Sequence, residues 1–247
     1  MSINKQIGIE GIYVVHGLEG YEEREKLLLR LLRDHFNMDF KFVTESTDAY
    51  VNQNWIEQYF TYNIKEILSS GAMFCTLVHI LCYEKIVADN NKYAIIFEND
   101  VCFLGDFKTK IKSVVEESDS LNEGFIISLE NSTLRFPSWR KIKKGKLLYE
   151  ASTGRCAGAY MIDQKGAQKI LNDLKTNKCK EVIDWWHNDL INRKIIKMYW
   201  AHPPLTEQGS FNGKLPSSIS IRSKGSIRTF RWNFQKFYKM YLLRWFR

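Results

Sequence analysis

The sequence lacks several features that mark common protein classes. No run of 18 apolar residues occurs, so we expect no membrane-spanning helix. The N-terminus lacks the apolar core and the cleavage site of a signal peptide. The five cysteines include no CxxC pair. We therefore expect free, mostly buried thiols of a reducing compartment, and no zinc site built by cysteines.

Signature motifs of several enzyme classes are also missing. The sequence contains no Walker A loop, no GxGxxG, no HExxH and no GxSxG. ATP-driven chemistry, Rossmann dehydrogenation and serine hydrolysis therefore lack their usual signatures. What remains are carboxylates, histidines and amides in less specific patterns.

Acidic residues are absent from one end of the chain. The formal net charge of the 247 residues is +8, and residues 221–247 hold eight Lys and Arg side chains and no Asp or Glu. Residues 1–220 are therefore formally neutral, which argues against a basic nucleic-acid-binding body. Only the tail has the charge to meet an anionic partner.

Short β-rich runs alternate with amphipathic segments along most of the chain. This alternation is typical of an α/β layer architecture with a mostly parallel sheet. We expect one domain over residues 1–220 and a tail over 221–247, separated by a linker at 223–226. The expected strands are 11–15, 40–43, 93–97, 124–128, 159–162 and 195–200, and the expected helices are 21–35, 72–88, 106–117 and 165–174.

Two carboxylates follow the strongest predicted strand, 93–97. Ligands of open α/β sheets gather beyond the carboxyl ends of strands, where Glu98 and Asp100 stand. Alternation along an extended backbone would point both side chains into one crevice and turn Asn99 away. Hard oxygen ligands suit Mn²⁺ or Mg²⁺ and a phosphate-bearing ligand. The alternative is a solvated turn at the end of the strand.

Three other positions admit two interpretations each. Asp184 lies before two tryptophans, so it is either a proton acceptor with a raised pKa or a helix cap. His79, four residues after Cys75 on an apolar helix, is either a core residue or part of a site. Gln208 lies in an expected loop after the last strand, which either covers the crevice or is a rigid connector.

Taken in order, five segments resemble glycosyltransferase family 25, which includes bacterial lipopolysaccharide and lipooligosaccharide glycosyltransferases. The resemblance covers residues 10–220. The segments are Ile12–Val15 followed by Arg24; Gly71–His79 with Tyr83–Ile86; Tyr93–Val101, with Glu-Asn-Asp where the family has Glu-Asp-Asp; Ala159–Leu171; and Val182–Trp186 with Pro203–Gln208, followed by Ser217–Ile219.

The resemblance implies a GT-A fold, a nucleotide-binding αβα sandwich, and inverting transfer of a hexose, most often galactose, from a UDP-sugar. The acceptor would be a lipid-linked or lipopolysaccharide oligosaccharide. The resemblance implies that Asp100 and Glu98 hold Mn²⁺ or Mg²⁺. Of the two, Asp100 would bind the metal directly, and Glu98 would lie nearer the ribose of the donor or contact the metal ligands. Asp184 is the general base or an acceptor-binding residue. Arg24, His79, Glu98 and Gln208 line the donor site.

Three departures from the family pattern bear on these roles. Asn99 replaces a central Asp, Val78 replaces a Ser, and 16–20 replaces an Asn-Leu-x-Arg opening. The change at Asn99 removes one negative charge. The alternative function is therefore a catalytically degenerate family member that binds a sugar nucleotide or a glycan.

The tail has aromatic residues at helical spacing. Phe230, Phe234, Phe237, Tyr241 and Trp245 fall on one helical face, and the basic residues fall largely off it. This pattern is typical of an interfacial helix on anionic lipid, which implies a cytoplasmic enzyme peripheral to the inner face of a bacterial membrane. The alternatives are a helix packed on the body, an oligomer contact and nucleic-acid binding, which the neutral body disfavours.

Overall fold

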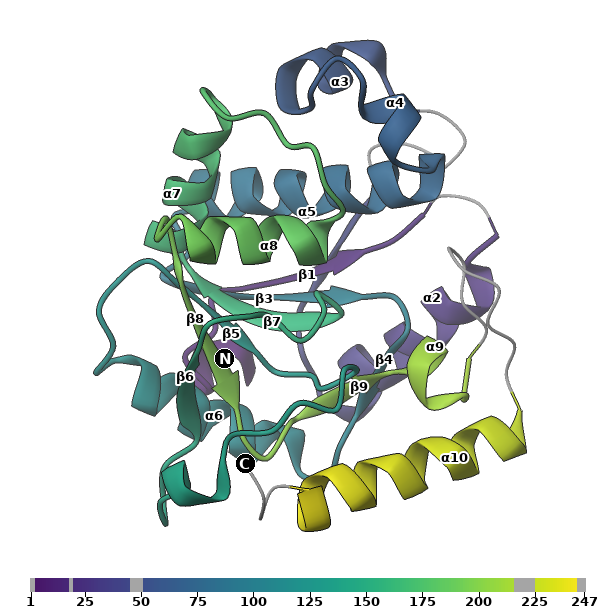
Figure 1. Cartoon of the computed structure of the whole chain (residues 1–247), viewed down its shortest axis with the longest axis vertical. Coiled ribbons are helices and arrows are strands. Elements are labelled where there is room, and N and C mark those ends of the chain that lie inside the picture. Colours follow the sequence, from purple (N-terminus) through teal and green to yellow (C-terminus); the bar gives the residue numbers. More distant parts are fainter. Residues whose placement is uncertain (1–2, 18–19, 45–50, 216–224, 244–247) are drawn as a thin grey trace.

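The computed structural model describes residues 3–17, 20–44, 51–215 and 225–243. Its centre is a seven-stranded sheet of strand order β2-β1-β3-β7-β5-β8-β6 (Figure 1). The expected segments Ser217–Ile219 and residue Trp245 lie outside the described residues, as do parts of the 16–20 segment and of the 223–226 linker. The strands of this sheet are β1 (Gly11–Val15), β2 (Lys41–Val43), β3 (Tyr93–Glu98), β5 (Phe125–Ser128), β6 (Leu148–Ala151), β7 (Ala159–Asp163) and β8 (Lys197–Ala201).

The sheet is mostly parallel, as predicted, with two exceptions. Strand β1 runs parallel to β2 and β3, and β5 runs parallel to β8. Strand β7 is antiparallel to both of its neighbours, and β6 is antiparallel to β8. All five residues of β7 are buried. Its pattern is therefore that of any strand covered on both faces, and does not reveal its direction.

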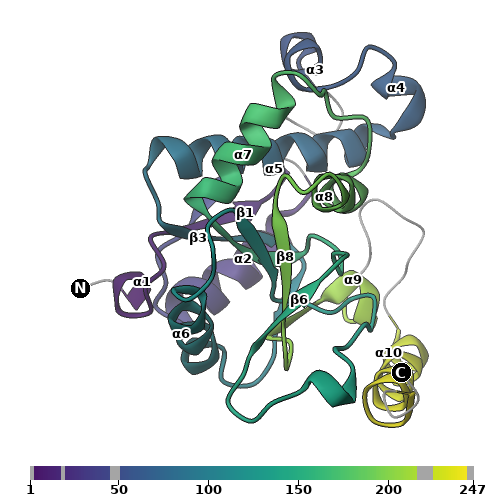
Figure 2. The ribbon, with the colours of Figure 1, turned by 60° about the vertical axis from the view of Figure 1, so that its left-hand side comes forward.

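Helices cover both faces of the sheet (Figures 1 and 2). Each face has its own apolar core, so the α/β sandwich expected from the sequence is confirmed. One face carries α5 (Ser70–Ala88), α7 (Gln164–Leu174) and α8 (Ile183–Asn192), with α3 (Gln53–Tyr59) and α4 (Ile64–Ile67) beyond them. The other carries α1 (Ile3–Gln6), α2 (Glu22–Leu28) with its π-helical continuation η1 (Leu29–His35), and α6 (Phe107–Ser118).

Helix α5 is the central helix of its face. It is long and apolar enough to cross a membrane by length and composition, but 61% of its most apolar window is buried inside the protein. Leu77, Ile80 and Ile86 are fully buried against the sheet. Its apolar character is therefore that of a core helix.

A small second sheet follows β3. Strand β4 (Val101–Phe103) pairs antiparallel with β9 (Thr206–Gln208), and Val101 is opposite Gln208. The sequence predicted a loop at 201–210, and this was wrong for its second half. A three-residue strand is stabilised by its partner far away in the chain, and no local pattern shows that partner. The short helix α9 (Gly209–Asn212) follows at once.

The tail forms the helix α10 (Ser226–Phe237), which continues as the π-helical η3 (Tyr238–Leu242). One side packs on the body: Trp232 is only 9% exposed and contacts Phe211. Lys236 pairs with Glu207, and Arg228 donates to the carbonyl of Ser210. The predicted alternative of a helix packed on the body is therefore confirmed, and Phe230, Phe234 and Phe237 of the same helix remain exposed.

Candidate active site

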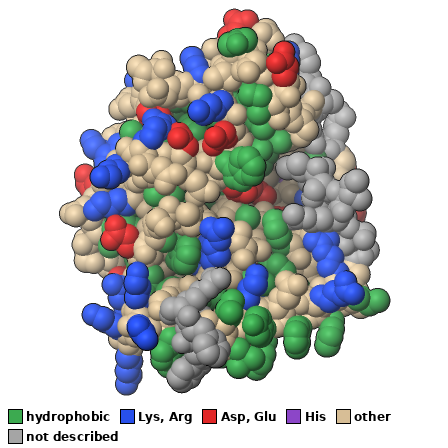
Figure 3. Space-filling model, viewed as in Figure 1, with side chains coloured by type: hydrophobic (Ala, Val, Ile, Leu, Met, Phe, Trp, Pro, Cys, Tyr) green, Lys and Arg blue, Asp and Glu red, His purple; other side chains and the backbone are tan. Residues whose placement is uncertain are grey.

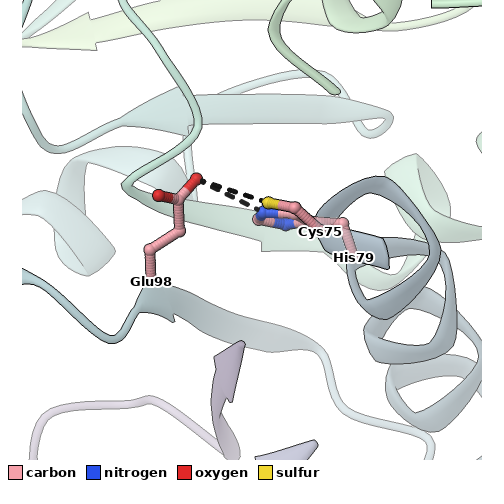
Figure 4. Close-up of side chains that lie close together, drawn as sticks. All are labelled: Cys75, His79 and Glu98. Carbon is pink, nitrogen blue, oxygen red and sulfur yellow. Dashed lines mark hydrogen bonds and ion pairs between the residues drawn. The ribbon is translucent and has the colours of Figure 1, made fainter. Parts of the chain in front are cut away.

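The candidate site lies at the end of β3. Along this strand Ala94 and Ile96 face the core on the α5 side, while Ile95 and Phe97 face the opposite core. Alternation therefore sends Glu98 toward α5. There it meets Cys75 and His79, which lie one turn apart on the same face of that helix (Figure 4).

Glu98 is surrounded by polar groups of three elements. Its Oε1 lies 4.0 Å from Cys75 Sγ and 3.7 Å from His79 Nε2. Its Oε2 accepts a hydrogen bond of 2.8 Å from Gln208 Nε2. Burial, followed by the negative charge of Asp100, raises the pKa of Glu98 to about 8. The charge of Asp100 is thus close enough to disfavour ionisation of Glu98.

Asp100 is buried beside the start of α9. Its Oδ2 accepts from the backbone N–H of Ser210 at 3.1 Å, and its carbonyl accepts from that of Gly209 at 2.7 Å. Its Oδ1 is buried without a hydrogen-bond partner among the described residues. The backbone at 99–100 is a turn. The turn expected as the alternative to a ligand site is therefore present, and it carries Asp100 of the candidate site.

Asn99 faces the other way, as predicted. Its Oδ1 accepts a hydrogen bond of 2.6 Å from Arg24, and its Nδ2 lies 3.4 Å from His16 Nδ1. Arg24 therefore lies beside the β3 turn, and its positive charge acts to lower the pKa of Glu98. The negative charge that is lost by having Asn99 in place of an Asp would therefore lie on the side of Arg24 and His16, away from Gln208.

Gln208 joins the site through β9. Its Nε2 binds Glu98, while its Oε1 is buried and has no partner within the described ranges. A Cβ on Gly158 would lie 2.3 Å from Gln208 Cγ. The glycine therefore makes the room in which this amide reaches Glu98.

Asp184 lies in the first turn of α8, after the cap residue Val182. Its carboxylate accepts hydrogen bonds from the Ala157 backbone and the Cys156 thiol. Its Oδ1 is buried without a partner in the described part of the chain. Burial and the charge of Glu98 raise its pKa to about 6. Asp184 is therefore a partly buried carboxylate close enough to Glu98 to feel its charge, and it does not cap the helix.

His79 is fully buried and belongs to a chain of hydrogen bonds. Its Nδ1 lies 2.8 Å from the Tyr160 hydroxyl, which lies 2.8 Å from the Tyr83 hydroxyl, which lies 2.6 Å from His187 Nε2. Burial lowers the pKa of both histidines to about 3, so both are neutral. His79 is at once a core residue and part of the site.

The sequence analysis missed a second charged cluster. Glu130 and Arg155 are both fully buried. Burial raises the pKa of Glu130, and the charge of Arg155 acts to lower it. Arg155 donates to the Ser128 and Ala201 carbonyls at 2.9 and 3.0 Å. Glu130 follows a predicted strand just as Glu98 does, so the same rule could have found it, whereas no local pattern marks Arg155.

Buried polar atoms without a partner collect at this edge of the sheet. Among the described residues they include carboxylate oxygens of Asp100, Asp184 and Glu130, the amide oxygen of Gln208 and His79 Nε2. Buried polar groups are almost always paired. Unpaired acceptors on carboxylates fit a cation and the donors of a ligand, so the residues present suit a divalent metal.

The chain is similar to known glycosyltransferases over most of its length. The family model of glycosyltransferase family 25, described as an LPS biosynthesis protein, matches residues 10–185. A glycosyltransferase 25 family member of Aedes aegypti is 20% identical over 220 residues, 81% of this chain and 36% of that protein. Procollagen galactosyltransferase 1 of Danio rerio is 22% identical over 223 residues, 85% of this chain and 36% of that protein.

The chain thus spans 36% of the length of each of these relatives. A solved glycosyltransferase involved in glycosylation of the major capsid of PBCV-1 is 10% identical, with a TM-score of 0.43, over 91% of this chain and 99% of that one. The family match runs from β1 into α8 and includes Glu98, Asp100 and Asp184. On this match, the chain belongs to glycosyltransferase family 25.

Proposed function

We propose that the protein is a metal-dependent, inverting hexosyltransferase that moves galactose from UDP-galactose to a lipid-linked or lipopolysaccharide oligosaccharide. The observation that carries this proposal is the group of buried, incompletely paired carboxylates at one sheet edge. Glu98 and Asp100 supply the cation ligands, and Asp184 supplies a base. Family membership supports sugar transfer in general.

On the donor side, Glu98 and Asp100 would hold Mn²⁺ or Mg²⁺. When bound, such a cation neutralises charge on the departing diphosphate. Gln208 holds the Glu98 carboxylate through a hydrogen bond of 2.8 Å. The Ser210 amide fixes one oxygen of Asp100 and leaves the other free. Arg24 adds a positive charge on the far side of the turn.

On the acceptor side, Asp184 would take the proton of the attacking hydroxyl. In a single displacement the new C–O bond forms as the bond from the sugar to the diphosphate breaks, and the acceptor proton must leave. A carboxyl group with a pKa of about 6 is ionised at neutral pH, yet is more basic than an ordinary aspartate. Its unpaired Oδ1 is available for this hydrogen bond.

The alternative of a catalytically degenerate binding protein rests on Asn99. The contacts of Asn99 weigh against it, because this side chain binds Arg24 and His16 rather than the groups around Glu98. The loss of the family's central charge therefore leaves Glu98, Asp100 and Asp184 in place.

UDP release from UDP-galactose, UDP-glucose and UDP-N-acetylgalactosamine, with and without Mn²⁺, tests the proposal. We expect slow Mn²⁺-dependent turnover of UDP-galactose that disappears in Asp100→Asn. The control Asp34→Asn removes the same charge at an exposed position on η1 and should behave as wild type. Silence with all three donors, and no nucleotide binding by calorimetry, would contradict the proposal for these donors and would favour a degenerate member that binds a glycan.

We also propose that α10 attaches the enzyme to the inner face of the membrane. Phe230, Phe234 and Phe237 are 72%, 63% and 57% exposed. Figure 3 shows hydrophobic side chains along the outer edge of this helix, with Lys and Arg side chains nearby. Lys236 is committed to Glu207, so the other basic residues of the tail carry the attraction to anionic lipid.

Vesicle co-sedimentation tests this attachment. Vesicles of phosphatidylcholine mixed with phosphatidylglycerol should bind the protein, and pure phosphatidylcholine should bind it less. The double variant Phe234→Ser, Phe237→Ser should lose about tenfold or more in affinity, since each buried Phe contributes roughly 1.5–3 kcal/mol. Tyr62→Ser, at an aromatic that is 98% exposed elsewhere, is the control. Equal binding by the double variant would contradict the proposal.

A further inference from the structure

Three groups that can ligate a metal converge where the first half of α5 faces the end of β3. Cys75 Sγ, His79 Nε2 and a Glu98 carboxylate oxygen all lie within 4.8 Å of one another (Figure 4). The distances from Glu98 Oε1 are 4.0 Å to the sulfur and 3.7 Å to the nitrogen. Ligands held at about 2.0–2.3 Å from a tetrahedral zinc ion lie roughly 3.4–3.7 Å apart. A small inward shift would therefore let the three atoms share one ion.

The buried hydrogen-bond chain leaves two cases for the tautomer of His79. When each tyrosine donates its one proton within the chain, the bonds from His79 to His187 all run in one direction. If they run from His79, its Nδ1–H donates to Tyr160, and Nε2 carries a lone pair. If they run toward His79, its Nε2–H points at Glu98 from 3.7 Å, too far for a hydrogen bond.

The first direction leaves a buried lone pair aimed at Cys75 and Glu98, and it gives the tautomer that can bind a metal through Nε2. Nε2 has no hydrogen-bond partner among the described residues. Tyr160 then serves as the group that fixes the tautomer and the ring orientation, which is the usual arrangement behind a histidine that binds a metal.

We propose that Cys75, His79 and Glu98 form a binding site for Zn²⁺ or a similar borderline-soft divalent ion, adjacent to the hard-cation site at Asp100 and sharing Glu98 with it. Thiolate, imidazole and carboxylate together suit Zn²⁺ and Co²⁺, whereas Mn²⁺ prefers oxygen ligands. Three protein ligands leave a fourth position for water. The Cys75 thiol must release its proton to solvent when the ion binds.

The site shares Glu98 with the donor site, and this has a functional consequence that rests on the proposed function. An ion held by Cys75 and His79 occupies the Glu98 carboxylate and places positive charge beside Asp100. Zn²⁺ should therefore inhibit Mn²⁺-dependent turnover, and excess Mn²⁺ should not fully reverse the inhibition, because Mn²⁺ competes poorly for sulfur and nitrogen ligands.

Cobalt spectroscopy of the full chain, without any sugar nucleotide, tests the site directly. Addition of Co²⁺ to wild type should give a near-ultraviolet sulfur-to-cobalt charge-transfer band and the visible bands of a tetrahedral ion. Cys75→Ser should abolish the charge-transfer band. Tyr160→Phe should keep the band but weaken Co²⁺ binding by about 10–100-fold. Circular dichroism confirms that each variant is folded.

Cys102→Ser is the matched control, because Cys102 is also partly exposed and lies close to the Asp100 carbonyl. It should keep the wild-type spectrum. A folded wild type without the charge-transfer band, a band that survives Cys75→Ser, or a band that disappears in Cys102→Ser would each overturn the proposal.

The spectra do not depend on sugar transfer, so the two proposals fail separately. A protein with the Cys75 band and no turnover keeps the soft-metal site and loses the transferase. A protein with turnover that is unaffected by saturating Zn²⁺, although Cys75 binds Co²⁺, contradicts the shared use of Glu98.

Discussion

Carboxylates with buried oxygens lie at both ends of the strands of the central sheet. They differ in whether all of their oxygens accept hydrogen bonds. Asp163, at the end of the antiparallel strand β7, accepts backbone hydrogen bonds from Gly124, Phe125 and Gly166 at 2.8, 2.7 and 3.0 Å. Asp100 and Asp184, at the other end, each keep one buried oxygen without a partner within the described ranges.

Burial raises the pKa of both Asp163 and Asp184, so a raised pKa does not distinguish the two ends of the sheet. The two ends differ in how many carboxylate oxygens accept hydrogen bonds. Asp163 uses its oxygens to cap α7 and join it to β5, which is a structural role. Asp100 and Asp184 each keep one oxygen without a hydrogen-bond partner among the described residues. In the proposed function, these two oxygens are the atoms that meet the metal and the acceptor.

The sharpest test of this contrast is Asp184→Asn. The amide has the same shape but cannot accept the acceptor proton, so donor turnover to an acceptor should fall by about 10²–10⁴-fold. The midpoint of thermal unfolding should stay the same or rise, because a desolvated charge is removed. Asp189→Asn on the same helix is the control, and an active Asp184→Asn enzyme would remove Asp184 from the role of base.

Loss of Asp163 should have the opposite outcome. Asp163→Ala leaves three backbone N–H groups without their acceptor and removes the cap of α7, which should lower the free energy of unfolding by about 3 kcal/mol. Asp100→Ala should change it by less than about 1 kcal/mol. Urea unfolding of the two variants measures the difference, and equal losses would contradict the division between the two ends of the sheet.

The site should also make the metal-free protein less stable as the pH rises. The pKa of Glu98 rises from 4.5 to about 8 on folding, so the folded protein keeps a proton that the unfolded chain loses. Stability contributed by that proton is therefore lost between about pH 4.5 and pH 8, by up to roughly 5 kcal/mol.

Thermal unfolding across this pH range, with and without Mn²⁺, measures the effect. Mn²⁺ should stabilise the protein more at high pH, where it no longer competes with a proton. Glu98→Gln should remove part of the pH dependence and leave the part due to Glu130, whose pKa is raised to about 8 as well. A Glu98→Gln profile that matches wild type would show that Glu98 ionises normally.

The smallest expected effect concerns the room that Gly158 makes. A methyl group there would lie within 2.6 Å of three Gln208 side-chain atoms. Gly158→Ala should therefore displace the amide and break its bond to Glu98, at a cost of about 1 kcal/mol and about a tenfold fall in turnover. Gly154→Ala, where a methyl group meets nothing closer than 3.6 Å, should be nearly silent.

The sequence identified much of the site through one rule. Glu98 and Asp100 follow a predicted strand, and the carboxyl end of a strand in a mostly parallel sheet is where ligands bind. The same rule applies to Glu130, which was overlooked. Asp184 stood out because an acid beside two tryptophans is unusual, but the sequence left open whether it caps the helix.

The sequence by itself determined the α/β layers, because the apolar period along each segment specifies its element and its buried face. It also determined the family and the acidic end of β3. The tertiary structure alone decided the direction of β7, the strand that carries Gln208, the burial of Arg155 and the meeting of Cys75 and His79 with Glu98. Each of these depends on partners far apart in the chain, and local periodicity does not record them.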